Sequence, residues 1–494
     1  MNLDFVTVKL SRLKEKEMEK TKSFAQRIEL FWDWFLTNEE KLSDFVENRD
    51  KYEGDDIVDF ITEGIGLISD SICFNVGGNY EFTFTIGGSD HLFYLFPHLV
   101  ATVPESLKDK WTFFPCMQGT QGISFGFGMY GVTTDTDQIQ VSFTVSEENK
   151  ADIRFYQKEL AGLTEKECYD AFYIVMENCI GEALAHTCIG NVQLASNAEE
   201  DMFSLTELQG KLKDAFCKDG HVADPADMNF TYQLKPKEDY AHLREDVFIG
   251  TGNNAVLINA YYDEEVERYQ DFTELGAKPV FLFYCYDKNV EGKAALNERY
   301  DIMDSLEEIV LLPRGSANEI GIMLGGAMGQ SFAYIDMILF NPAEFMEKVG
   351  LVLRNYPYLF CLSEFKSEGD IILLNCDDAS DLARKMQFVH ENNGHLQIVK
   401  AYEALDKAEH DYALTGYYGR ALNNVERYED ALHVLQSQKD VGEKDAVWHY
   451  RVGYSLYYLD RDSEAAEHFK RSIEIGGPDE EAQYFLDDCL KRIH

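Results

Sequence analysis

The sequence is short of basic residues. It has 45 lysines and arginines against 88 aspartates and glutamates, which gives a formal net charge of -43 at pH 7. Such a negative surface repels phosphate backbones and anionic lipid headgroups, so we expect neither nucleic acid nor a membrane surface as a partner. The acidity has two interpretations, plain solubility or attraction of a basic partner protein, and composition does not separate them.

The sequence also lacks a CxxC pair, although it contains ten cysteines. Scattered single cysteines in apolar surroundings are typical of a reducing compartment, where thiols stay free. No apolar run reaches the length that a membrane-spanning helix needs, and the first residues lack the apolar core of a signal peptide. We therefore expect a cytoplasmic protein.

A phosphate-binding lysine is missing from the glycine-rich stretch GIMLGGAMG, which starts at Gly321. Gly321 and Gly326 have the spacing of a Walker loop, but Ala327 and Met328 stand where that loop has lysine and a hydroxyl residue. Leu324 breaks the GxGxxG pattern of dinucleotide-binding loops. The segment that follows predicts a strand, whereas a phosphate loop needs a helix there. We therefore expect a bend or bulge between two strands.

Motifs for metal binding and catalysis are scarce as well. Asp287, Asn289, Gly292 and Glu298 have the spacing of a calcium loop, but a strand-like segment precedes them where an EF-hand needs a helix. We therefore expect a surface loop. The sequence contains neither an HExxH zinc pair nor a GxSxG nucleophile. It predicts no metal ion, no cofactor and no catalytic residue, and leaves open an enzyme whose site assembles in space between two α+β halves.

The hydrophobic pattern predicts an α+β fold, with two mixed α+β subdomains followed by an all-α region. Residues 12–200 combine aromatic-rich helices with short alternating strands. Residues 201–376 contain further apolar runs that predict strands, 255–262 and 308–313 among them. From 377 to 494 only helical periodicity is left.

The first predicted helix is apolar over most of its circumference. Four of its residues repeat at helical spacing and predict core positions: Phe24, Ile28, Phe31 and Phe35. Trp32 and Trp34 point to different sides, so a partner-docking surface is the alternative. Thr37 followed by Glu40 fits a capping box and predicts that a new helix starts there.

The all-α region repeats with a period of 34 residues. Five pairs of similar residues have this spacing: Gly419 and Gly453, Leu422 and Leu456, Val425 and Leu459, Ala431 and Ala465, and Leu435 and Phe469. The region therefore resembles the tetratricopeptide repeat (TPR) family. The resemblance implies helical hairpins at about 412–445 and 446–479 and a capping helix at 479–493.

The resemblance also implies a peptide-binding groove, formed by the first helix of each repeat. Placing the family's inward positions on this sequence gives Arg420, Asn423, Asn424, Tyr450, Tyr454, Tyr457 and Tyr458. Arginine and asparagine can bond a peptide's carboxylate or amides, and tyrosine adds contact area at low entropic cost. The alternative is that some of these tyrosines pack against the capping helices. The implied function is that of an adaptor or scaffold that binds another protein or peptide.

A second resemblance covers residues 26–376. Segments such as FWDWFLTNEEKL, REDVFIGTGNNAVLINAYY and GGAMGQSFAYIDMILF are similar to a family of uncharacterised bacterial proteins. The resemblance implies a bacterial cytoplasmic origin and a two-part α+β body, but no activity. The acidic charge leaves one more interpretation, an immunity or antagonist protein that masks a basic effector.

Overall fold

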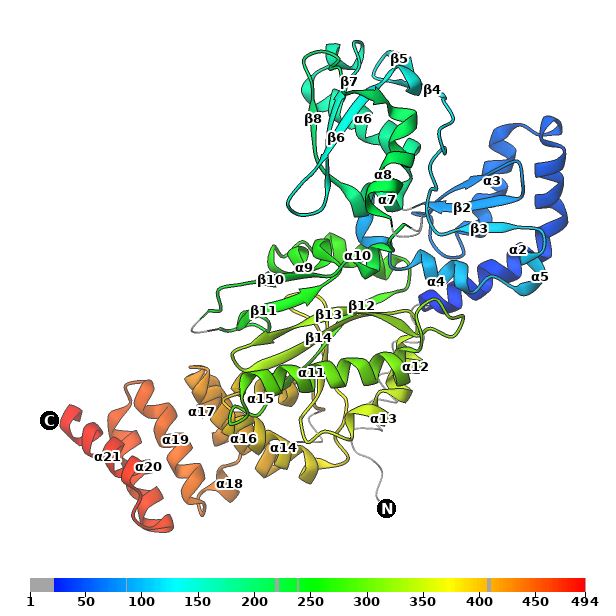
Figure 1. Ribbon diagram of the computed structural model, residues 1–494. Helices are drawn as coiled ribbons and strands as arrows, with labels where there is room; N and C mark the ends of the chain where they lie inside the picture. The colour runs from blue at the N-terminus through cyan, green and yellow to red at the C-terminus, as the bar shows by residue number, and fades with distance from the viewer. Residues whose placement is uncertain (1–21, 86, 218–221, 238–239, 407–409, 494) are drawn as a thin grey trace.

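The computed structural model describes residues 22–493 apart from 86, 218–221, 238–239 and 407–409. Two α+β bodies lie beside a central seven-stranded sheet, and a helical array continues from the sheet to the C-terminus (Figure 1). The predicted order, an α+β body and then helices, is therefore confirmed. Within the part of the chain that the structure describes, no helix has both the length and the apolar character to cross a bilayer.

The first body combines helices with a three-stranded sheet of order β1-β2-β3. Strands β1 and β2 are antiparallel, and β2 and β3 are parallel. The elements are α2 (Phe24–Glu47), α3 (Gly54–Ile65), β1 (Cys73–Val76), β2 (Glu81–Thr85), α4 (Phe96–Ala101), α5 (Glu105–Lys108) and β3 (Thr112–Phe114).

Helix α2 begins at a capping box in which the Ser23 and Gln26 side chains each accept a hydrogen bond from the other residue's backbone N–H. Its four predicted core residues are at most 1% exposed, so the core interpretation is confirmed. The prediction of a new helix at Thr37 is wrong, because α2 continues through this position. The Thr37 hydroxyl donates to Asp33 O (2.8 Å) and so bonds within the helix.

The second body contains the four-stranded sheet β8-β7-β6-β9 and the hairpin β4-β5. Its elements are β4 (Gly126–Met129), β5 (Val132–Asp135), β6 (Gln140–Val145), β7 (Ala151–Tyr156), α6 (Glu165–Ile180), α7 (Glu182–Cys188), β8 (Ile189–Leu194), β9 (Phe203–Ser204) and α8 (Leu208–Phe216). The buried side chains of this body form a core of their own, which runs from Ile139 to Leu212. The structure thus divides the described part of the predicted domain 12–200, residues 22–200, between two cores, and α8 joins the second although it lies beyond residue 200.

The central sheet has the order β10-β11-β13-β14-β12-β15-β16, and neighbouring strands are antiparallel throughout. Helices α9 and α10 lie on one side of it and α11 and α12 on the other (Figure 1). The elements are β10 (Phe230–Gln233), β11 (Val247–Gly252), α9 (Ala255–Tyr262), α10 (Val266–Glu274), β12 (Lys278–Cys285), α11 (Gly292–Leu306), β13 (Gly321–Gly329), β14 (Phe332–Leu339), α12 (Pro342–Lys348), α13 (Gly350–Leu353), β15 (Cys361–Glu364) and β16 (Ile371–Leu373).

Two of the predicted strands are helical. Residues 255–262 form α9, whose first turn is capped by the Asn254 side chain. The segment predicted at 308–313 lies largely in a π-helical turn, Glu307–Leu311, that extends α11. Both errors have one cause, because a short apolar run has the same composition in a buried strand and in a buried helix.

The glycine-rich stretch is itself a strand, β13, and not merely a bend between strands. Its register against β14 shifts between Met323 and Gly325, so the predicted bulge lies inside it. Gly325 has φ 128°, and a Cβ on Gly326 would lie 2.3 Å from Tyr334 O. These glycines let the strand backbones approach closely. As predicted, the segment after the stretch is a strand, β14.

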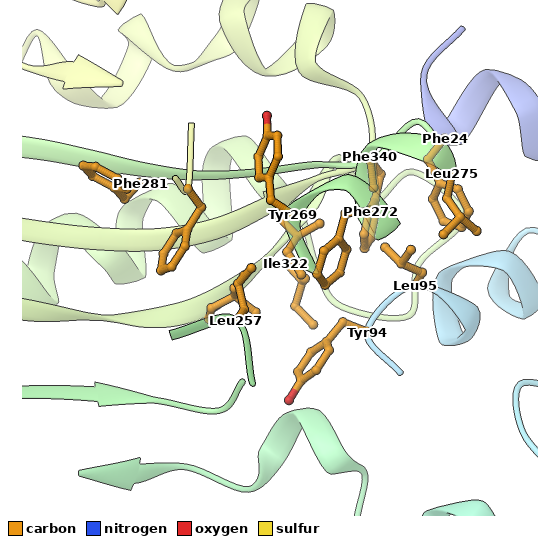
Figure 2. Close-up of a cluster of buried hydrophobic side chains, with 14 of the residues drawn as sticks. Phe24, Tyr94, Leu95, Leu257, Tyr269, Phe272, Leu275, Phe281, Ile322 and Phe340 are labelled. Carbon is orange, nitrogen blue, oxygen red and sulfur yellow. The ribbon is translucent and has the colours of Figure 1, made fainter. Parts of the chain in front are cut away.

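The first body and the central sheet share a continuous core. Phe24, at the start of α2, packs edge-to-face on Phe340, with ring centroids 5.7 Å apart. The Tyr94 hydroxyl donates to Asn253 O beside β11 (2.5 Å). Figure 2 shows these rings in one cluster with Phe272 of α10. This packing fixes the first body against the α9–α10 side of the sheet.

Beyond residue 378 the described residues form helices and turns without a strand. The helices are α14 (Ala379–Glu391), α15 (His395–Glu403), α16 (Tyr412–Asn424), α17 (Tyr428–Gln436), α18 (Lys439–Gly442), α19 (Ala446–Tyr458), α20 (Asp462–Gly476) and α21 (Glu480–Ile493). Gln397 of α15 joins the array to the sheet, because its side chain accepts from Cys285 N (3.0 Å) and donates to Leu359 O (2.6 Å).

The array repeats in space as it does in sequence. A Cβ added to Gly419 of α16 would lie 2.6 Å from the Leu435 side chain of α17, and one added to Gly453 of α19 would lie 3.1 Å from Phe469 of α20. The members of these two contacts are 34 residues apart, because 453 minus 419 and 469 minus 435 both equal 34. Each hairpin thus closes on the same glycine contact.

Candidate binding cavity in the helical array

A cavity of about 430 Å³ opens in the helical array between α16, α19 and the turn that joins α20 to α21. Five of the seven residues that the sequence assigned to a groove line this cavity: Arg420, Asn423, Asn424, Tyr450 and Tyr454. Tyr457 and Tyr458 lie elsewhere. The first helices of the two hairpins therefore supply one common wall.

Asn423 joins the two first helices. It is 4% exposed. Its Nδ2 donates to Arg451 O (3.1 Å), and its Oδ1 accepts from the Ser455 hydroxyl (2.8 Å). Because the amide is already bonded on both sides, Asn423 positions α19 against α16, and it is less available to a peptide than the sequence suggested.

Two arginines give the cavity a cationic wall. Arg420 on α16 is exposed, and Arg451 on α19 is half-buried. Burial and the like charge of Arg420 lower the pKa of Arg451 to about 10. The Nε of Arg451 is buried without a hydrogen-bond partner, and no salt bridge joins either guanidinium to a carboxylate among residues 22–493 as described. The charge of Asp445 acts on Arg451, but Asp445 forms no salt bridge with it, so both guanidiniums still have donors for an anion.

The turn between α20 and α21 brings acidic side chains to the same cavity. Asp479 and Glu481 both line it and both are exposed. Burial raises the pKa of Tyr450. The Tyr450 side chain is also hydrogen-bonded to Glu481, and the negative charge of Glu481 raises this pKa further. Gly477, with φ 87°, permits the turn that leads into α21. The cavity thus has groups of both charges in its lining.

The structure places Tyr457 in the core. It is 8% exposed, its ring lies 5.0 Å from that of Phe485 on α21, and its hydroxyl donates to Asp488 (2.8 Å). Tyr457 therefore fastens the capping helix rather than lining the groove. Tyr458 is 44% exposed but stacks on Tyr428, with ring centroids 4.7 Å apart, outside the cavity.

The sequence reasoning missed three of the charged residues that line the cavity: Arg451, Asp479 and Glu481. Helical spacing could have found Arg451, because it lies three residues before Tyr454 on the same face of α19. The two acidic residues gave no such signal. They reach the cavity only because the capping helix folds back beside α19.

The calcium-loop residues have other partners. Strand β12 precedes them, as predicted. Asp287 Oδ1 accepts from Asn289 N (2.9 Å), and Glu298 accepts from the Tyr358 hydroxyl (2.6 Å). Across the described residues, no group of three or more His, Cys, Asp or Glu side chains is arranged to hold a metal ion.

Carboxyl groups gather where the second body meets the first. Glu182, 1% exposed, accepts from Met117 N (2.8 Å) and from the Thr85 hydroxyl. Burial raises the pKa of Glu177 to about 7, and the charges of Glu182 and Asp90 add to the effect. Such a carboxyl has a pKa suited to acid–base chemistry. The hydrogen bonds of Glu182 nevertheless join the two bodies. We therefore infer that these carboxyl groups have a structural role and not a catalytic one.

Glu177→Gln tests what the half-buried Glu177 carboxyl costs in stability. Its folded pKa of about 7 exceeds its ordinary value of 4.5, so the charged form opposes folding once the pH rises above 4.5. We expect the glutamine variant to have a free energy of unfolding about 2 kcal/mol higher at pH 8, after allowance for solvent screening, and a clearly smaller gain at pH 5. Urea denaturation at both pH values measures the difference. An equal gain in stability at pH 5 and pH 8 would contradict the raised pKa of Glu177.

No protein-family model, no curated protein and no solved structure matches this chain. What the cavity does must therefore be argued from the chain's own residues.

Proposed function

We propose that this chain is a TPR-type protein-interaction protein that acts as an adaptor or scaffold in the bacterial cytoplasm. One observation carries the proposal: the first helices of two successive hairpins bring arginines and tyrosines to one cavity. A bound peptide would supply a carboxylate to Arg420 and Arg451, neither of which forms a salt bridge within the described residues, and tyrosines add rigid contact area. The ten cysteines, all free thiols, support the cytoplasmic location.

Site-specific photocrosslinking tests the proposal in living cells. Val447 lines the cavity and is 51% exposed, whereas Val441 on α18 is 55% exposed and is not part of the lining. A photoreactive amino acid at position 447 is expected to give a discrete protein adduct, and the same group at 441 is expected to give none. Equal adducts at both positions would place the binding surface elsewhere.

Arg420→Ala and Tyr457→Ala separate binding from stability. Arg420 is exposed in the cavity, so its loss is expected to reduce the adduct at position 447 about tenfold while the free energy of unfolding changes by less than about 0.5 kcal/mol. Tyr457 is buried against Phe485, so its truncation is expected to cost about 3 kcal/mol of stability. Adduct yields and urea denaturation curves give the two readouts. If Tyr457→Ala left stability unchanged, our placement of this tyrosine in the core would be wrong.

A further inference from the structure

The binding cavity contains both charges, and each comes from a different part of the array. The arginines lie on the first helices α16 and α19, whereas Asp479 and Glu481 lie at the turn into the capping helix. Asp479 Oδ1 accepts from Ala482 N (2.8 Å) and so caps α21. Helix capping therefore fixes the position of the acidic group relative to the arginines.

The two arginines of the cavity favour the binding of an anion. The buried Nε of Arg451 has no hydrogen-bond partner, and the like charge of Arg420 opposes that of Arg451. A carboxylate in the cavity can bind the two guanidiniums that line it and reduce this repulsion.

A purely anionic ligand does not fit the rest of the molecule. The chain has a net charge of -43, and its field repels a highly acidic partner at long range. Asp479 and Glu481 in the same lining add local repulsion. A cationic group close to the ligand's carboxylate turns this repulsion into attraction, because Asp479 and Glu481 then face a positive charge.

We infer that the cavity selects a peptide segment in which an acidic side chain lies within a few residues of a lysine or arginine. The acidic group binds Arg420 and Arg451, and the basic group binds Asp479 and Glu481. This inference rests on the proposed function and narrows it, because it defines the charge pattern of the bound segment.

Selection from a phage-displayed library of random linear peptides on the full chain tests the inference. Peptides that carry neighbouring acidic and basic residues are expected to be enriched. Arg420→Glu is expected to abolish the enrichment of acidic residues, and Glu481→Lys that of basic residues. Both side chains are exposed, so both variants are expected to fold. Arg471→Glu and Glu467→Lys are the matched controls, because they reverse exposed charges on α20 outside the cavity lining.

Direct binding of one enriched peptide gives the magnitude. Arg420→Glu and Glu481→Lys are each expected to raise Kd about tenfold, and the two control variants are expected to leave it unchanged. Peptides that crosslink at position 447 without a charge pattern would overturn the inference and leave the proposed function standing. Failure to select any peptide that binds at this position would count against both.

Discussion

Asp336→Leu is expected to lower the free energy of unfolding by about 3–5 kcal/mol. Asp336 on β14 is 1% exposed and holds the equally buried Arg244 through two bonds, of 2.6 and 3.1 Å. Burial acts to lower the pKa of Arg244, but the charge of Asp336, its hydrogen bond and the neighbouring Tyr232 and Tyr262 together outweigh this effect, so the guanidinium stays protonated. Removal of Asp336 leaves that charge in the core without a counterion. Urea denaturation followed by circular dichroism measures the loss.

Two controls show whether the charge or the packing is responsible. Arg244→Met combined with Asp336→Leu removes both charges and is expected to recover most of the lost stability. Arg471→Ala breaks an ion pair with Glu474 whose side chains are about half exposed, and it is expected to cost at most about 1 kcal/mol. If the double variant were no more stable than Asp336→Leu, lost packing rather than an unpaired charge would explain the result.

Gly326→Ala is expected to destabilise the central sheet by about 3 kcal/mol. The added methyl carbon would lie 2.3 Å from Tyr334 O, a backbone atom of the neighbouring strand β14 that cannot rotate away. The strands must separate or the ladder must break, and both disturb the middle of a seven-stranded sheet. The loss is measured by urea denaturation of the purified variant.

Gly210→Ala provides the matched control. Gly210 is exposed within α8, and an added Cβ would meet nothing within 4 Å. There the same substitution is expected to raise stability by about 0.5–1 kcal/mol, because alanine favours a helix more than glycine does. The two variants should therefore move the unfolding midpoint in opposite directions. A neutral Gly326→Ala would mean that β13 and β14 can move apart at little cost.

The sequence makes two predictions for the glycine-rich stretch, that it is not a phosphate loop and that it is a bend or bulge between two strands. The local sequence was enough for the first prediction and not for the second. Ala327 and Met328 excluded a phosphate loop from their chemistry alone, since neither side chain can bind phosphate. Pattern did not show that Gly321–Gly329 is itself a strand. Gly326 must come close to Tyr334 O, and that requirement arises from the neighbouring strand β14.

The sequence also predicted only part of the candidate site, because its pattern shows positions along one helix and not the neighbours of that helix. The 34-residue period located the two first helices and so five of the residues that line the cavity. Periodicity could not distinguish Tyr454, which lines the cavity, from Tyr457, which packs on Phe485 of α21. Both rings contact Phe485 of α21, and the fold leaves only Tyr454 half-buried at the cavity wall.

The sequence by itself determined the α+β body, the helical C-terminal region, its repeat and the buried face of α2. Each of these follows from the spacing of apolar residues along a single segment. Only the tertiary structure decided that residues 255–262 form a helix, that the N-terminal half has two cores, and that Asp479 and Glu481 share a cavity with Arg451. The physical reason is that spacing shows which side of an element is buried, whereas the partner that buries it comes from elsewhere in the chain.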